Sequence, residues 1–242
     1  MFWRAFKNTL FLSISKLLLN TFAAVVVSLL LNEIINVHFK KVAQTIIYLP
    51  HFLSWVVTAS VFGLILSPSS QGLVNSFLAS IGVVEKGREI YFLGSLKWWT
   101  PAFFVINVWK DTGWQTIIIM ATLVGISQEI YEAAGIDGAG RWKKMWYITM
   151  PALANTIITV IILNLAKVLN LFESVFVLQN DAVMEKAEVI QTYVYNQTFN
   201  SGGIPNYGYT TAVGLFKSLV GCVLVLICNY ISKKVRNGRG IV

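Results

Sequence analysis

The sequence predicts an all-α, polytopic integral membrane protein, and three observations support this fold class. Of the 242 residues, 56% are hydrophobic and only 12% are charged, against about 25% charged residues in soluble domains. The apolar residues gather in five runs of about 20 residues or more, each long enough to cross a bilayer. The basic residues lie between and after these runs, where membrane proteins keep their cytoplasmic charges.

The five apolar runs follow one another with polar segments between them. They cover about residues 9–31, 42–66, 98–124, 152–178 and 210–231. The first run is too long for a signal peptide, whose apolar core has roughly 7–15 residues, and it leads into Asn32 and Glu33 instead of a cleavage site. We therefore expect a transmembrane domain over 9–232, an external stub of residues 1–8 before it and a cytoplasmic basic tail, 233–242, after it.

Lysine and arginine set the expected orientation, because cytoplasmic loops of membrane proteins are rich in both. The tail 233–242 and the loop 127–151 are basic and are expected in the cytoplasm, whereas segments 67–97 and 179–209 then face outward. Five spans with a cytoplasmic C-terminus place residues 1–8 outside, although Arg4 and Lys7 would hold them inside. We expect a sixth helix to precede Met1. The basic residues concerned are Lys233, Lys234, Arg236 and Arg239 in the tail, and Arg141, Lys143 and Lys144 in the loop.

Loop 127–151 has the composition of a docking element. Its first half reads as a short helix capped by Ser127, and Gly138 then permits a sharp change of direction. Its small residues would let a partner approach closely, and Glu132 and Asp137 can pair with a basic partner. Pro151 is expected to begin the next span, where its missing N–H costs little. The alternative is a solvated loop with a chance run of alanine and glycine, and the physical argument leaves both open.

The same loop resembles the EAA signature of bacterial ABC-importer permeases, which reads Glu-Ala-Ala, three residues, Gly, nine residues, Ile, one residue, Leu-Pro. Segments 2–10, 48–55 and 92–99 are similar to the carbohydrate branch of that family, and most similar to oligosaccharide permeases of the LplB type. The resemblance implies a type I importer permease fold and a loop, including Asp137, that couples to an ATPase. The residues that match the signature are Glu132, Ala133, Ala134, Gly138, Ile148 and Pro151, with Met150 in place of the leucine.

The resemblance also implies a set of partners and a place for the chemistry. The expected partners are a second permease subunit, two ABC ATPase subunits and an extracytoplasmic solute-binding protein. The sequence has no Gly-x-x-x-x-Gly-Lys-Ser/Thr phosphate-binding loop, so we expect no ATP hydrolysis on this chain. Under the resemblance, ATP and Mg²⁺ bind to the partner ATPase, and this chain holds no cofactor.

No catalytic or metal-binding pattern occurs in the sequence. His38 and His51 are isolated, and Cys222 and Cys228 lack redox or metal-ligand spacing. The chain has 19 Lys and Arg against 11 Asp and Glu, but the basic residues form no single stripe, so we expect no nucleic-acid partner. The apolar runs indicate membrane lipid as the surroundings.

Polar residues inside the third and fourth runs are the candidates for a substrate pathway, because ionisable groups in spans are costly and usually face a cavity or a partner. They either line a hydrated sugar route or pair between helices, and both interpretations stay open. Lys16 and Lys217 are expected to snorkel or pair. The candidates of the third run fall at i, i+3, i+4 and i+7 on one helical face: Asn107, Lys110, Asp111 and Trp114. Those of the fourth run recur every three residues: Asn164, Lys167, Asn170 and Glu173.

The resemblance implies translocation of an oligosaccharide, from a plant or algal polysaccharide, across the bacterial cytoplasmic membrane. Lys110 and Lys167 would bind the carboxylate of a uronic acid in such a substrate. One rival is a permease of the same machinery for another small solute, such as amino acids or phosphate. The other rivals are a membrane-embedded enzyme and a structural or sensory membrane subunit.

Overall fold

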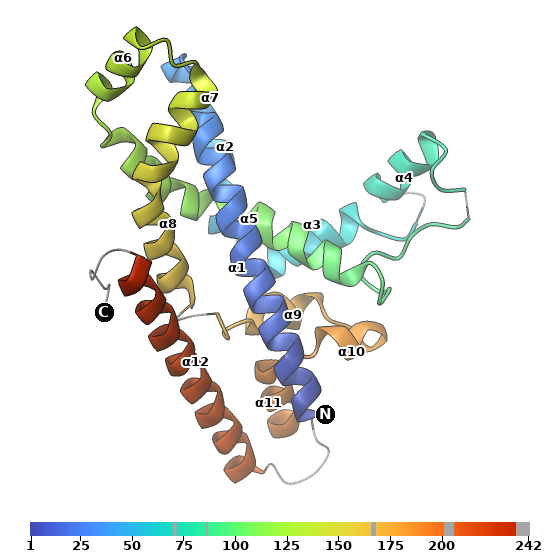
Figure 1. Cartoon of the computed structure of the whole chain (residues 1–242). Helices are drawn as coiled ribbons and strands as arrows, with labels where there is room; N and C mark the ends of the chain where they lie inside the picture. The colour runs from blue at the N-terminus through green and yellow to red at the C-terminus, as the bar shows by residue number, and fades with distance from the viewer. Residues whose placement is uncertain (70–71, 86, 166–167, 201–205, 236–242) are drawn as a thin grey trace. The chain divides into compact units, whose positions relative to one another are not determined.

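The computed structural model describes residues 1–69, 72–85, 87–165, 168–200 and 206–235, and every regular element in these ranges is helical (Figure 1). The expected all-α class is therefore confirmed. Two short 3-10 helices, η1 and η3, and one π-helical segment, η2, accompany the α-helices. In chain order the elements are α1 (Phe2–Asn32), α2 (Val37–Tyr48), η1 (Leu49–Phe52), α3 (Trp55–Ile65), α4 (Leu73–Ser80), α5 (Trp99–Val124), α6 (Gln128–Ile136), α7 (Arg141–Lys144), η2 (Met145–Thr149), α8 (Met150–Leu165), α9 (Phe172–Leu178), η3 (Asp181–Val183), α10 (Met184–Ala187), α11 (Ile190–Phe199) and α12 (Tyr207–Val235).

The chain divides into two compact units, and each has its own core. Each unit is assembled from three separate stretches of the sequence, so residues far apart along the chain meet within it. The first unit is Met1–Lys16, Phe52–Lys110 and Val168–Val220, and the second is Leu17–His51, Asp111–Lys167 and Gly221–Val242.

The core of the first unit is aromatic and aliphatic. Trp99 and Phe103 are fully buried on α5 and stack with their ring centroids 5.1 Å apart. The indole N–H of Trp99 donates a hydrogen bond to the carbonyl oxygen of Leu178 at 2.9 Å, so this large side chain is buried without an unpaired donor. These residues pack with others from α1, α5, α9 and its N-cap, and the segment 183–189: Leu12, Ile106, Leu171, Val175, Val183, Ala187 and Val189.

The second unit packs the C-terminal half of α1 against α5 and α8. Thr122 and Thr156 meet across α5 and α8 with their hydroxyl oxygens 2.8 Å apart. Gly113 lets α5 approach α2 closely: a Cβ at this position would overlap the carbonyl oxygen of Ile47 and lie 2.9 Å from the Cα of Tyr48. The core residues are Ala24, Val25, Leu31, Ile119, Met120, Leu123 and Leu153.

Three helices are long and apolar enough to cross a membrane: Phe2–Asn32, Arg141–Leu165 and Tyr207–Tyr230. Two further pairs reach this length only together, across a bend. These are Val37–Phe52 with Trp55–Ile65, bent by 106°, and Trp99–Val124 with Gln128–Ile136, bent by 67°. The described residues therefore provide three candidate spans, or up to five if each bent pair is one span, where the sequence predicts five.

The second apolar run, expected as one span over 42–66, is broken. α2 ends at Tyr48, and a 3-10 turn that contains Pro50 follows. Ser54 then caps α3 by accepting a hydrogen bond from the N–H of Val57 at 3.2 Å. Proline has no N–H and disfavours a continuing α-helix before it. The run is therefore not one continuous helix, although its two parts together are long enough for one span, and hydropathy does not register this break.

The fourth apolar run, expected as one span over 152–178, is also not one helix. α8 ends at Leu165 and α9 begins at Phe172. Between them, Val168, Leu169 and Leu171 are buried although none lies in a helix. The apolar character of these residues serves the packing of the first unit, so the run is long without being a single helix.

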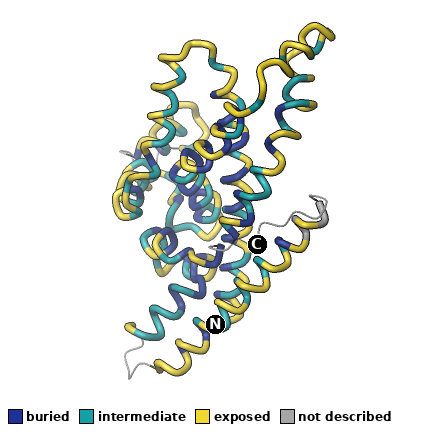
Figure 2. The backbone as a smooth tube through the Cα atoms, turned by 90° about the vertical axis from the view of Figure 1, so that its left-hand side faces the viewer, coloured by how far each residue is buried: buried dark blue, intermediate teal, exposed yellow. Residues whose placement is uncertain are grey.

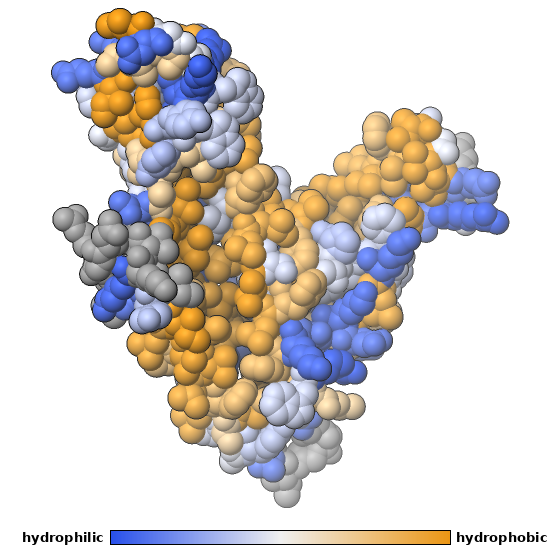
Figure 3. All heavy atoms as spheres, viewed as in Figure 1, coloured by the Kyte–Doolittle hydropathy of each residue, from blue (hydrophilic) through white to orange (hydrophobic). Residues whose placement is uncertain are grey.

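The helix α12 exposes much of its apolar surface. Leu215, Leu219 and Leu226 are 68%, 64% and 59% exposed. Figure 2 colours most of this helix as exposed, and Figure 3 shows hydrophobic residues along it. An apolar face of this extent needs lipid or another protein beside it, which fits a helix that crosses a membrane.

Candidate functional site

The helix α6 begins the loop between α5 and α8 and is fastened along one side. Ser127 caps it by accepting a hydrogen bond from the N–H of Glu129 at 3.3 Å. The hydroxyl of Tyr131 lies 2.8 Å from that of Thr149 in η2. The ammonium of Lys144 approaches Gly135 so closely that a Cβ there would lie 3.0 Å from Nζ. These contacts hold one face of α6 against η2 and α7.

The other face of α6 is exposed. Glu132 and Ala133 are exposed on it, and Ile136 exposes 89% of its surface. Asp137 follows the last turn and is exposed too. Among the described residues, neither Glu132 nor Asp137 forms an ion pair or a side-chain hydrogen bond. The helix therefore presents small, apolar and acidic groups together, without using them inside its own chain.

Gly138 ends α6 in the left-handed conformation, with φ of +73°. The N–H of Ala139 bonds to the carbonyl oxygen of Ala134 at 2.8 Å, and the N–H of Gly138 bonds to that of Gly135 at 3.1 Å. This pair of bonds is the Schellman motif, in which a glycine at this position satisfies the last carbonyl groups of a helix. The sharp change of direction expected at Gly138 is therefore a helix C-cap.

Ile148 and Pro151 lie inside a helical stretch, Arg141–Leu165, instead of at its start. Pro151 was expected to begin the span. It lies in the first turn of α8, but the helical stretch already starts at Arg141. The π-helical η2 lies directly before it, and the N–H of Met150 bonds to the carbonyl oxygen of Met145, five residues back. In a regular α-helix a proline ring clashes with the carbonyl oxygen of the preceding turn. The wider π-helical turn relieves this clash.

The third-run candidates that lie in the first unit are buried. Lys110 is 4% exposed, its ammonium donates a hydrogen bond to the carbonyl oxygen of Leu53, and it lies 5.4 Å from the ring centroid of Trp55. Asn107 is fully buried and donates from its amide to the carbonyl oxygen of Phe103 at 2.7 Å. The Lys110 contacts favour the pairing interpretation and leave this lysine badly placed to meet a carboxylate in a hydrated route, whereas the Asn107 bond stays within α5.

The third-run candidates that lie in the second unit both contact His51. The Asp111 carboxylate is 3.6 Å from Nδ1 of His51, and the Trp114 ring stacks on the imidazole with centroids 5.1 Å apart. His51 looks isolated in the sequence, but η1 brings it to this side of α5. Trp114 remains 50% exposed, so one of its faces packs while the rest of the ring is accessible.

The sequence predicted that the fourth-run candidates share one side of a helix. The structure does not place them on a common helix. Asn164 lies on α8 and donates to the carbonyl oxygen of Val160 at 2.8 Å within its own helix. Asn170 lies between helices, Glu173 is exposed in the first turn of α9, and Lys167 lies outside the described residues. The helix ends at Leu165, so the spacing of three residues no longer places these side chains in a row.

Comparison with known proteins identifies the family. Residues 19–237 match the family described as "Binding-protein-dependent transport system inner membrane component". The chain belongs to this family. The family that the resemblance of loop 127–151 indicated is thereby confirmed, and the protein is an inner-membrane permease subunit of an ABC transporter.

Two curated relatives and two crystal structures resemble the permease over nearly its whole length. Protein LplB of Bacillus subtilis is 41% identical over 96% of this chain and 71% of its own. The polygalacturonan/rhamnogalacturonan transport system permease protein YteP, also of Bacillus subtilis, is 39% identical over 96% of this chain and 70% of its own. A bacterial ABC transporter involved in the import of the acidic polysaccharide alginate superposes with a TM-score of 0.89 at 36% identity, over 97% of this chain and 79% of that chain. The bacterial alginate transporter in complex with an alginate pentasaccharide-bound periplasmic protein gives 0.90 at 35% identity, over 99% of this chain and 81% of that chain. The type I importer permease fold is therefore confirmed.

Sequence reasoning missed a polar cluster of the permease around Asn170. The amide oxygen of Asn170 accepts hydrogen bonds from the ammonium of Lys217 at 2.9 Å and from the amide of Gln191 at 3.4 Å. The three residues come from the turn before α9, from α12 and from α11, so no local spacing connects them. Asn170 and Lys217 each carried a signal, as polar or charged residues within apolar runs, but nothing in the sequence indicated that they meet.

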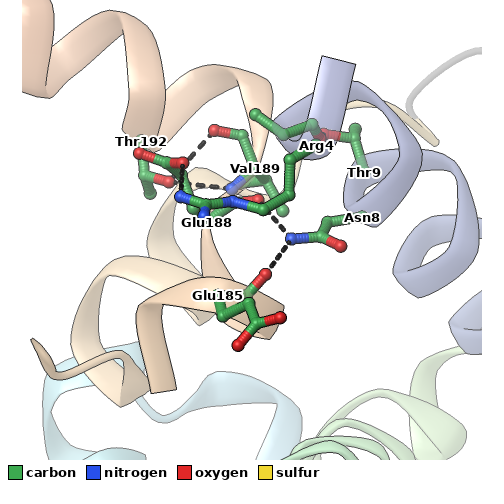
Figure 4. Close-up of polar contacts among 8 residues, drawn as sticks. Arg4, Asn8, Thr9, Glu185, Glu188, Val189 and Thr192 are labelled. Carbon is green, nitrogen blue, oxygen red and sulfur yellow. Dashed lines mark hydrogen bonds and ion pairs between the residues drawn. The ribbon is translucent and has the colours of Figure 1, made fainter. Parts of the chain in front are cut away.

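Sequence reasoning also missed how the start of α1 is held. Residues 2–8, expected as a separate stub, belong to α1. Figure 4 shows the guanidinium of Arg4 at 3.0 Å from the carboxylate of Glu188. Asn8 donates to the carbonyl oxygens of Glu185 and Glu188 at 2.9 and 3.0 Å, and Thr9 accepts from the N–H that begins α11 at 2.9 Å. We call this set of contacts the Arg4–Glu188 latch.

A tyrosine pair lies beside the latch in the first unit. The hydroxyl oxygens of Tyr193 on α11 and Tyr209 on α12 are 3.1 Å apart. Burial, with the neighbouring hydroxyl of Tyr209, raises the pKa of the Tyr193 phenol to about 12. This phenol is therefore neutral at physiological pH and acts as a hydrogen-bonding group.

Proposed function

We propose that this permease is one subunit of an ATP-driven importer that moves an oligosaccharide across the bacterial cytoplasmic membrane. Two relatives carry carbohydrates in their names: polygalacturonan and rhamnogalacturonan for one, and the acidic polysaccharide alginate for the other. Each resembles the permease over at least 96% of its length. The family supports a transporter over the rival interpretations of a membrane enzyme or a sensory subunit.

The single observation that carries the proposal is the exposed face of α6. A helix of nine residues that is fastened on one side through Tyr131 and leaves Glu132, Ala133 and Ile136 exposed is built to meet another protein. The partner in this proposal is an ABC ATPase, whose basic groups would pair with Glu132 and Asp137. ATP and Mg²⁺ bind there, because the permease has no phosphate-binding loop of its own.

The coupling is mechanical in this proposal. Closure of the ATPase subunits on ATP displaces α6, whose C-cap at Gly138 leads directly to α7. The helical stretch Arg141–Leu165 begins there and receives that displacement at its end. Ile148 lies inside the π-helical η2 and Pro151 directly follows it. Both would act at this point, because η2 is the irregular part of an otherwise continuous helix.

The proposed orientation follows from the candidate spans. The stretches Arg141–Leu165 and Tyr207–Tyr230 are both long enough to cross, and they separate α6 from the segment after residue 230. Two crossings return the chain to the same side, so α6 and the C-terminal segment would share one side, which in this proposal is the cytoplasm. The remaining partners in the proposal are a second permease subunit, a second ATPase subunit and an extracytoplasmic solute-binding protein.

The test uses the complete transporter, purified through a tag on the permease and reconstituted in liposomes. Glu132→Ala is expected to lower both the amount of ATPase that co-purifies and the ATP-dependent uptake of oligosaccharide by about tenfold, as loss of a buried interfacial charge pair does. Glu85→Ala is the matched control, because Glu85 is an exposed glutamate outside α6. Normal ATPase retention and uptake in Glu132→Ala would overturn the proposed contact.

A further inference from the structure

A pocket of about 320 Å³ lies in the first unit and is lined by residues of α9, α11 and α12. Its volume is at the small end of the range of about 300–1,000 Å³ that is usual for small-molecule sites. The lining brings one cation together with amide, hydroxyl and aromatic groups. Its members include Phe172, Gln191, Tyr195, Thr198, Phe199 and Lys217.

Lys217 supplies the positive charge of this pocket. It lies on α12 within the candidate span Tyr207–Tyr230, where a charged side chain is costly and usually marks a functional contact. Among the described residues no carboxylate forms an ion pair with its ammonium. Glu173, on the adjoining α9, makes no such pair either. The charge is therefore available to an anion from outside the chain.

A network of amides fixes the position of this ammonium. Asn170 accepts from Nζ of Lys217 at 2.9 Å and from Nε2 of Gln191 at 3.4 Å. The amide oxygen of Gln191 in turn accepts from the N–H of Phe172 at 2.9 Å. A snorkelling lysine would extend along its helix toward water, whereas this one is held by a neutral acceptor that takes only one of its three donors.

Aromatic rings form the wall of the same pocket. The ring centroids of Phe172 and Tyr195 are 5.5 Å apart, and those of Tyr195 and Phe199 are 5.2 Å apart. Aromatic faces pack against the apolar C–H faces of a sugar ring, while hydroxyl and amide groups can bond its hydroxyls. A carboxylate accepts a strong, charge-assisted hydrogen bond from an ammonium.

We propose that this pocket is a subsite for a uronic acid unit of the transported oligosaccharide, with Lys217 binding the sugar carboxylate. The inference rests on the proposed oligosaccharide import and adds the charge of the substrate to it. It also moves the anion contact away from Lys110, which is buried against Leu53 and Trp55. Asn170 and Gln191 are the positioning residues for the Lys217 ammonium.

The test measures uptake of two matched probes by the complete reconstituted transporter. One probe is a trigalacturonate, and the other is the same trisaccharide with its carboxyl groups reduced to alcohols. Lys217→Gln is expected to raise the half-saturating concentration of the acidic probe about tenfold and to leave that of the neutral probe unchanged. Lys217→Arg should restore much of the affinity for the acidic probe, because it keeps the charge. Lys186→Gln is the matched control, since it removes an exposed lysine of the first unit away from the pocket.

Asn170→Asp separates ligand binding from structural pairing. The new carboxylate would lie beside the Lys217 ammonium and neutralise it, so acidic uptake should fall as in Lys217→Gln while the transporter still assembles. If Lys217 only pairs with Asn170, this change strengthens the pair and acidic uptake stays normal, which overturns the subsite. Equal loss of both probes in Lys217→Gln, or wild-type uptake of the neutral probe alone, overturns it too. Wild-type uptake of neither probe would instead contradict the proposed oligosaccharide import.

Discussion

At Gly138 the backbone restricts the side chain, whereas the surrounding space does not. The residue has φ of +73°, and a Cβ built there would meet no atom within 4 Å. Left-handed backbone costs an L-residue about 1–2 kcal/mol. Asparagine tolerates this conformation better than other residues, because its short side chain can hydrogen-bond locally.

We therefore expect Gly138→Ala to weaken the C-cap of α6 by about 1–2 kcal/mol and to reduce ATP-dependent uptake several-fold. Gly138→Asn should keep most of the uptake, since it can occupy the same backbone conformation. The measurement is uptake in liposomes at equal amounts of assembled transporter. Equal uptake by the alanine and asparagine variants would show that the left-handed conformation is unimportant for coupling.

At Gly113 the surrounding atoms restrict the side chain, and the backbone conformation does not. A Cβ would overlap a backbone carbonyl of α2, at Ile47, and backbone atoms cannot rotate away. Overpacking of this kind costs about 1–3 kcal/mol. Gly113→Ala should lower the unfolding temperature of the detergent-solubilised permease. Gly63→Ala is the control, because Gly63 also lies inside a helix but has nothing within 4 Å, and it should leave that temperature unchanged or raise it.

The residues of the loop were more predictable from sequence than those of the pathway. Ser127 and Gly138 act through bonds to neighbours in sequence, so the local pattern was sufficient to predict a cap and a turn. Lys110 and Lys217 look alike in sequence, as single lysines in apolar runs. Their environments differ because Lys110 meets the backbone of Leu53 and Lys217 meets Asn170, and such tertiary contacts follow from the packing of distant elements.

At the level of elements, the same contrast between local sequence signals and tertiary contacts explains the two broken runs. The break between α2 and α3 had a signal, because Pro50 is followed by Ser54, a good N-cap residue. The break between Leu165 and Phe172 had none, since it contains neither proline nor glycine and is rich in apolar residues. Hydropathy reports burial in lipid or protein alike, so it could predict the five runs but not their interruptions.

The Arg4–Glu188 latch gives an element-scale prediction. The Glu188 side chain is only 9% exposed, so removal of Arg4 leaves a nearly buried carboxylate without its partner, at a cost of about 1–2 kcal/mol after allowance for the partly exposed arginine. We expect Arg4→Ala to increase hydrogen exchange of the amides at the start of α11, measured by mass spectrometry. Lys7→Ala, which removes an exposed basic residue of the same helix, should leave that exchange unchanged. Unchanged protection in Arg4→Ala would mean that Asn8 and Thr9 hold α11 without the ion pair.

For the whole molecule, the candidate spans determine which segments share a side of the membrane. One candidate span, Arg141–Leu165, separates α6 from η3 along the chain. A single crossing puts these two elements on opposite sides. The proposed ATPase contact requires α6 to lie on the cytoplasmic side. The expected outward position of segment 179–209 requires η3 to lie on the external side.

Single-cysteine labelling tests this topology in cells. The two native cysteines, Cys222 and Cys228, are replaced by serine, and a cysteine is then introduced by Ile136→Cys on α6 or by Ala182→Cys on η3, both at exposed positions. A membrane-impermeant maleimide should label the η3 variant in intact spheroplasts and the α6 variant only after the membrane is opened. Labelling of α6 from outside would remove it from the reach of any cytoplasmic ATPase, because a motor that hydrolyses ATP has to contact the permease on the side where ATP is available. Labelling of both positions from one side would mean that the stretch Arg141–Leu165 does not cross the bilayer.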